Sequence, residues 1–117
     1  MAAKPPIKPL HKKQKTLIIS PFYTQRLLEI AEYGYELFGV KVSDAFISKI
    51  ESKVMTLPKM PDIHPKNHFI ESNEKKIYRN ILVGKYIILY SVTTHTIHVI
   101  TIYHSAINPE TIKTFIM

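Results

Sequence analysis

The chain has 117 residues, with 16 Lys and Arg against 9 Asp and Glu, no cysteine and a formal net charge of +7. A chain of this length forms one domain, and without cysteine it has neither a disulfide nor a thiolate nucleophile or zinc ligand. No apolar run approaches the roughly 20 residues that span a bilayer, so we expect a cytoplasmic protein without membrane contact. The excess of positive charge favours association with polyanions or with an acidic protein.

The first 13 residues differ in composition from the rest of the chain. Residues 1–13 contain several prolines and lysines, and their only larger aliphatic side chains are Ile7 and Leu10. Such a segment buries too little apolar surface to pay for a fixed conformation. We therefore predict a basic, proline-rich flexible arm at 1–13, followed by a single domain at 14–117.

Two helices are predicted in the first half of this domain. A short strand at 15–20 ends in a serine followed by a proline. The serine hydroxyl can cap a helix, and the proline suits the first helical position. The helix that begins there is predicted to span about 21–38 and to end at Gly39. A second helix, predicted at about 43–57, follows after about four residues, which makes the two helices antiparallel neighbours. The expected buried stripes, at helical spacing, are Leu27, Ile30, Ala31, Gly34, Leu37 and Phe38, then Phe46, Ile47, Ile50, Val54 and Leu57.

Three consecutive strands are predicted in the second half. A proline-rich connection at 58–75 carries the chain to strands at 76–83, 85–92 and 96–103. The middle strand is almost continuously apolar, which is typical of a strand buried on both faces at the centre of a sheet. Gly84 can supply the positive φ of the first hairpin.

The order strand, helix, helix, strand, strand, strand predicts an α+β domain. In it, two antiparallel helices pack on one face of a small, mainly antiparallel sheet. The pattern leaves open whether the first strand lies at the edge of the sheet or beside the last strand. Asn108-Pro109-Glu110 looks like another helix start, and the residues after it allow two turns at most.

Several features stand in a recognisable order along the chain. They are Ser20-Pro21 at the strand–helix junction, Phe38-Gly39 at the first helix end, Tyr78-Arg79, Gly84-Lys85-Tyr86, Tyr90 and His104. In this order they resemble the RelE/ParE superfamily of type II toxins, over about residues 15 to 112. The resemblance implies a compact toxin encoded beside an antitoxin that wraps it, with a target in translation or in DNA topology and no cofactor.

Members similar to RelE are ribosome-dependent endoribonucleases that cut messenger RNA with basic side chains. In them an arginine commonly follows the tyrosine that opens the central strand, where this sequence has Ile87. Further basic residues lie on the preceding strand, where it has Ile81 and Val83. Only Arg79 and His104 remain as catalytic counterparts, which is thin support for an enzyme.

Members similar to ParE resemble inhibitors of DNA gyrase, a binding activity that needs no convergent acid and base. Their pattern matches this sequence better: an aromatic-Arg pair, a Val-Gly-Lys-Tyr turn, and a later Tyr and His. The arginine that frequently follows this His is missing at 105–107. The resemblance therefore implies a ParE-like, plasmid-stabilising toxin that inhibits growth through gyrase. A ribonuclease acting on the ribosome and mRNA, and a non-toxic scaffold, are the alternatives. Candidate target- or antitoxin-binding residues are Tyr78, Arg79, Lys85, Tyr86, Tyr90 and His104.

Some candidate residues also have a structural explanation. Arg79 can pack its stem on neighbouring tyrosines, and His104 can be a hydrogen-bonded residue at a strand end. His64 and His68 have the four-residue spacing of helix-borne metal ligands, but Pro65 and the lack of a third ligand argue against zinc. No metal site is therefore expected.

Overall fold

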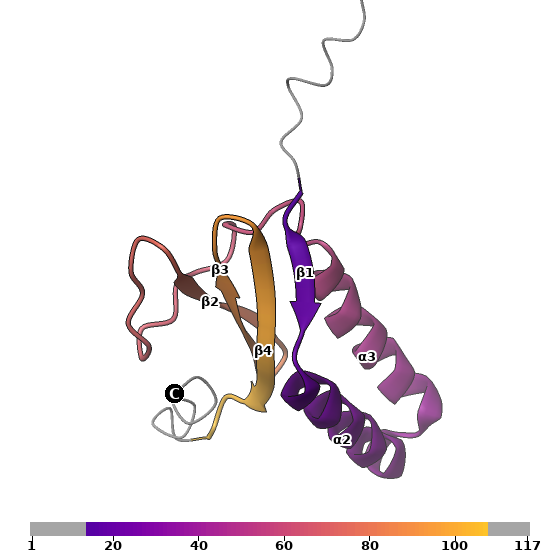
Figure 1. Cartoon of the computed structure of the whole chain (residues 1–117). Coiled ribbons are helices and arrows are strands. Elements are labelled where there is room, and N and C mark those ends of the chain that lie inside the picture. The colour runs from indigo at the N-terminus through magenta and orange to yellow at the C-terminus, as the bar shows by residue number, and fades with distance from the viewer. Residues whose placement is uncertain (1–13, 108–117) are drawn as a thin grey trace, which may run out of the picture.

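The computed structural model describes residues 14–107. These residues form one strand, two helices and then three strands (Figure 1). The elements are β1 (Thr16–Ile19), α2 (Pro21–Phe38), α3 (Val40–Met55), β2 (Ile77–Val83), β3 (Tyr86–Val92) and β4 (Thr96–His104). No helix in this part of the chain is long and apolar enough to cross a membrane. The predicted arm at 1–13 and the predicted helix start at Asn108 lie outside the described residues.

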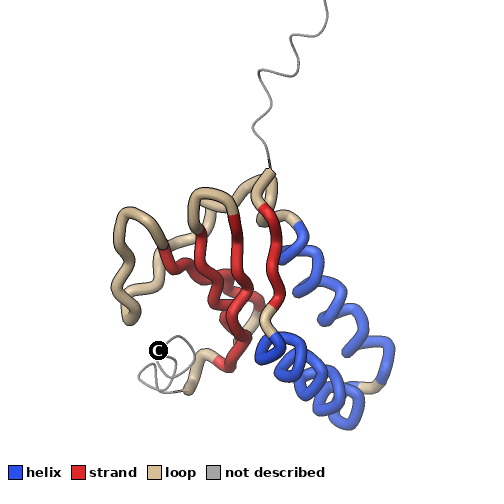
Figure 2. The backbone as a smooth tube through the Cα atoms, viewed as in Figure 1, coloured by secondary structure: helices blue, strands red, loops and turns tan. Residues whose placement is uncertain are grey.

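The four strands form one sheet in the order β1-β4-β3-β2 (Figure 2). β1 runs parallel to β4, whereas β4 with β3 and β3 with β2 pair antiparallel. The first strand therefore lies both at the edge and beside the last strand. Both helices lie on one side of the sheet, so the predicted α+β architecture is confirmed (Figure 1).

The main apolar core lies between the helices and the sheet, and a smaller cluster lies on the opposite face. Alternate residues of β3 serve the two clusters: Ile88 and Tyr90 belong to the first, and Leu89 to the second. All three are fully buried. Burial on both faces explains why β3 reads as a continuous apolar run.

Ser20 and Pro21 start α2 as predicted. The Ser20 hydroxyl accepts the backbone N–H of Phe22 at 3.0 Å, while the Ser20 N–H donates to the carbonyl oxygen of Val99 at 2.9 Å. One residue thus ends the pairing of β1 with β4 and caps the helix. Because no loop lies between β1 and α2, the direction in which α2 leaves the sheet is fixed.

The predicted start of the second helix near Ser43 is wrong. Gly39 alone separates the helices, because its φ of +86° turns the chain within one residue and α3 begins at Val40. The Ser43 hydroxyl does not cap α3 but donates to the carbonyl oxygen of Ala31 at 3.1 Å. It therefore ties the two helices together.

The long connection between α3 and β2 covers the outer edge of the sheet at β2. The N–H of Asn67 donates to the carbonyl oxygen of Tyr78 at 2.8 Å, and the N–H of Asn80 donates to that of Pro65 at 2.9 Å. The chain itself thus satisfies the carbonyl of Tyr78 and the N–H of Asn80 on this edge.

Candidate functional site

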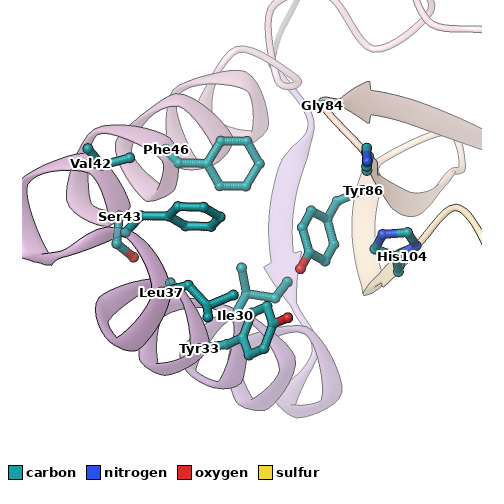
Figure 3. A pocket seen from close by; sticks show the side chains of 12 residues that line it. Ile30, Tyr33, Leu37, Val42, Ser43, Phe46, Gly84, Tyr86 and His104 are labelled. Atoms are coloured by element: carbon teal, nitrogen blue, oxygen red, sulfur yellow. The ribbon is translucent and has the colours of Figure 1, made fainter.

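An apolar groove of about 490 Å³ lies between the helical hairpin and the end of the sheet that carries the β2–β3 turn (Figure 3). Tyr86 and His104 form its sheet wall, with Lys85 at the turn. The helical wall is apolar and aromatic, formed by Ile30, Tyr33, Leu37, Phe38, Val42 and Phe46. A groove of this size and composition is typical of a binding site.

The tip of the helical hairpin projects beyond the sheet (Figure 1). Leu37, Phe38 and Val42 are each more than half exposed there. The prediction that Leu37 and Phe38 are buried is therefore wrong. The reason is the immediate turn at Gly39, which leaves the last turn of α2 without a sheet residue to pack against.

A close helix contact sets the geometry of this hairpin. A Cβ atom at Gly34 would lie only 2.5 Å from the hydroxyl oxygen of Ser43, a distance that real Cβ atoms do not adopt. Gly34 therefore lets α2 and α3 approach closely at the groove. The larger apolar side chains are left to line its walls.

Three neighbouring rings line the groove, Tyr86 and His104 from the sheet and Phe46 from α3. The ring centroids of Tyr86 and His104 are 5.4 Å apart in an edge-on arrangement, and those of Phe46 and Tyr86 are 5.9 Å apart. The Nδ1 of His104 accepts the backbone N–H of Ala106 at 3.0 Å. In the neutral ring, the proton therefore lies on Nε2, which can donate to a bound partner.

The groove continues along α2 into a second hollow of about 240 Å³. The two hollows share Ile30, Tyr33, Tyr86 and His104 in their walls. The second is more polar, because the Arg26–Glu29 ion pair, 3.0 Å between nitrogen and oxygen, lies at its side. Together they form an elongated surface with one apolar and one charged end.

Arg79 lies away from the groove and holds the 61–66 loop. Its Nη1 donates to the carbonyl oxygen of His64 at 2.7 Å, and its Nη2 lies 3.7 Å from a carboxylate oxygen of Asp62. Only 13% of the side chain is exposed. The guanidinium is therefore part of the packed structure.

Tyr90 holds the same loop from β3. Its hydroxyl donates to the carbonyl oxygen of Pro61 at 2.9 Å, and burial raises its pKa above the usual value of 10. Tyr78 lies on the opposite face of the sheet, packed against Ile70, Leu89 and Ile100. Neither tyrosine lines the groove.

His64 provides a test of this loop by pH. Burial, followed by the nearby charges of Lys53 and Arg79, lowers the pKa of His64 below its usual 6.5. His64 of the unfolded chain therefore takes up a proton at a higher pH than His64 of the folded chain. The contribution of neutral His64 to the free energy of unfolding is complete above pH 6.5 and decreases as the pH falls below 6.5. We expect the free energy of unfolding of wild type to fall more steeply than that of His64→Gln between pH 7 and 5. Urea unfolding at each pH measures this, and parallel curves would contradict it.

The structure brings Lys85, Tyr86 and His104 together and separates them from the other candidate residues. Arg79 pairs with Tyr90 and His104 with Tyr86, so the two positions are four residues apart along β3, about 13 Å of strand. Sequence reasoning missed the apolar wall of the groove. The sequence signal for this wall is the high density of large apolar residues on both sides of Gly39. There are more of them than one buried stripe of a helix can accommodate.

No three His, Asp or Glu side chains within residues 14–107 are placed to hold a metal ion. The groove and its surroundings are instead suited to binding a protein segment. Its walls offer apolar contacts, and their polar groups include Lys85, His104 and the Arg26–Glu29 pair.

Comparison with known proteins identifies the family. A family model described as ParE toxin of type II toxin-antitoxin system, parDE, matches residues 17–109. A chain of the chromosomal ParDE TA system from P. aeruginosa has a TM-score of 0.63 at 13% identity, covering 78% of this chain and 96% of that one. A chain of the archaeal RelE-RelB complex from Pyrococcus horikoshii OT3 has a TM-score of 0.47 at 14% identity, covering 82% and 100%. No curated protein matches the sequence. Because the family model spans β1 through β4, this chain belongs to the family of ParE toxins of type II toxin–antitoxin systems.

Proposed function

We propose that this ParE-type toxin inhibits growth by binding a DNA topoisomerase, gyrase, and that a cognate antitoxin neutralises it. The placement of Arg79 supports binding over RNA cleavage. Its guanidinium is hydrogen-bonded to the carbonyl of His64 and is largely buried. To reach a scissile phosphate it would have to release the loop that it holds.

Further features speak against the alternative of a ribosome-dependent endoribonuclease. His104 lies about 13 Å of strand away from Arg79, so the two do not converge on one phosphate. Ile87 cannot donate a hydrogen bond to a transition state, and loss of one preorganised donor typically costs about 3 kcal/mol. A cleavage activity of this chain would be feeble.

The groove supports an antitoxin as partner. The P. aeruginosa structure of similar fold is of a ParDE TA system, which suggests a partner of the same kind for this chain. An amphipathic segment can lay its apolar face against Leu37, Phe38 and Phe46. Acidic residues on its flank would then meet Lys85, in a protein of net charge +7.

One preparation of the protein tests the choice of target. We expect it to inhibit DNA supercoiling by purified gyrase and to leave messenger RNA on translating ribosomes uncut, because no convergent set of basic groups is available. A His104→Ala variant runs alongside in both assays. Ribosome-dependent cleavage that His104→Ala abolishes, with supercoiling untouched, would establish the ribonuclease alternative. A protein inactive in both assays that still binds its antitoxin would be the non-toxic scaffold.

A further inference from the structure

The two edges of the sheet differ. The edge at β2 is covered by the chain itself at Tyr78 and Asn80. At β1, Thr16 donates its N–H to the carbonyl oxygen of His95 and Ser20 donates to that of Val99, both at 2.9 Å. Even-numbered residues of β1 thus direct their backbone groups toward β4, and Leu17 and Ile19 direct theirs outward. Within residues 14–107 no backbone hydrogen bond satisfies these outward groups.

Within residues 14–107, the β1 edge also lacks the features that protect edges in other proteins. Exposed edge strands are usually guarded by charged side chains, proline, a bulge or a covering segment. β1 has the sequence Thr-Leu-Ile-Ile, without charge, and Ile18 and Ile19 are exposed. The nearest charge, on Lys15, is directed elsewhere, because its Nζ donates to the carbonyl oxygens of Thr93 and Thr94 at 2.7 and 2.8 Å.

We propose that β1 pairs antiparallel with β1 of a second copy of this chain, about a two-fold axis at Ile18. In this register Leu17 of each copy lies opposite Ile19 of the other. Because both residues direct their backbone groups outward, each of these pairs exchanges two N–H to C=O hydrogen bonds. Ile18 then meets its own counterpart in the closer, non-hydrogen-bonded pair, and the two sheets become one continuous sheet.

A second copy fits this edge for two reasons. The register is self-complementary, as a two-fold interface requires, and it satisfies all outward groups of Leu17 and Ile19. The contact strand carries no charge, so two molecules of net charge +7 need not bring like charges together there. Because the contact is short, the dimer is weak, and the dimeric fraction rises with protein concentration. It depends on neither gyrase nor the antitoxin.

A charge exchange at Ile18 tests this dimer. Ile18 is exposed in the single molecule, so Ile18→Lys and Ile18→Glu should fold like wild type, which circular dichroism verifies. In the dimer each variant would place two like charges face to face, whereas an equimolar mixture would place Lys opposite Glu. Leu82→Lys, at an exposed position on the opposite edge strand β2, is the control.

Sedimentation equilibrium from micromolar to millimolar concentration gives the result. We expect the mean mass of wild type and Leu82→Lys to rise toward that of a dimer, each Ile18 variant to stay monomeric, and the mixture to regain the dimer. A wild type that stays monomeric throughout, or an Ile18→Lys variant that dimerises like wild type, would overturn the proposal. If the wild type is monomeric and Ile18→Lys no longer binds the antitoxin, the β1 edge is the site of the antitoxin. This result would equally overturn the proposal.

Discussion

Replacing Arg79 by alanine is expected to lower the free energy of unfolding by about 3 kcal/mol, a large effect for one polar side chain. The substitution removes the donor to the carbonyl oxygen of His64 and leaves that oxygen without its partner under the loop. It also removes the stem of a largely buried side chain opposite Tyr90 in the β2–β3 pair. The ion pair with Asp62 adds little, because its separation is 3.7 Å and the carboxylate is exposed.

Arg26→Ala is the matched control for this change. Arg26 also pairs with a carboxylate, that of Glu29 at 3.0 Å, but both side chains are about half exposed. Its removal should change the free energy of unfolding by about 0.5 kcal/mol or less. Urea unfolding followed by circular dichroism compares the two variants. Equal midpoints would mean that the Arg79 guanidinium is not needed by the fold, and would favour its use on a substrate.

Much of the fold is encoded in local signals. The Ser20-Pro21 junction predicts the start of α2 because capping depends only on neighbouring residues. The apolar run of β3 predicts its interior place because both of its faces need apolar side chains. The place of β1 is not predictable in this way, since its pairing with β4 joins residues some eighty positions apart along the chain.

The site is less predictable than the fold. Tyr86 and His104 are candidates from the sequence, and they lie together at the groove. Leu37 and Phe38 have the spacing of core residues, but spacing does not reveal whether a facing element exists to bury them. For Arg79, the sequence gives no sign that the chain at 61–66 folds over it, because proline-rich loops carry no periodic pattern.

The helical wall of the groove contains one leucine that can be compared with a close equivalent outside it. Leu37 and Leu28 both lie on α2 and are both 54% exposed, but only Leu37 lines the groove. A glutamate at either position stays in water in the free toxin, so both variants should keep the wild-type stability. In the complex, only the charge at position 37 would be buried against an apolar and acidic partner.

Isothermal titration of the cognate antitoxin into wild type, Leu37→Glu and Leu28→Glu tests the role of the groove most directly. We expect Leu37→Glu to raise the dissociation constant by about a hundredfold, close to 3 kcal/mol, because a carboxylate would lose its hydration without gaining a partner. Leu28→Glu should stay within a few-fold of wild type. Equal affinities of the two variants, or a greater loss for Leu28→Glu, would contradict the assignment of the antitoxin to the groove.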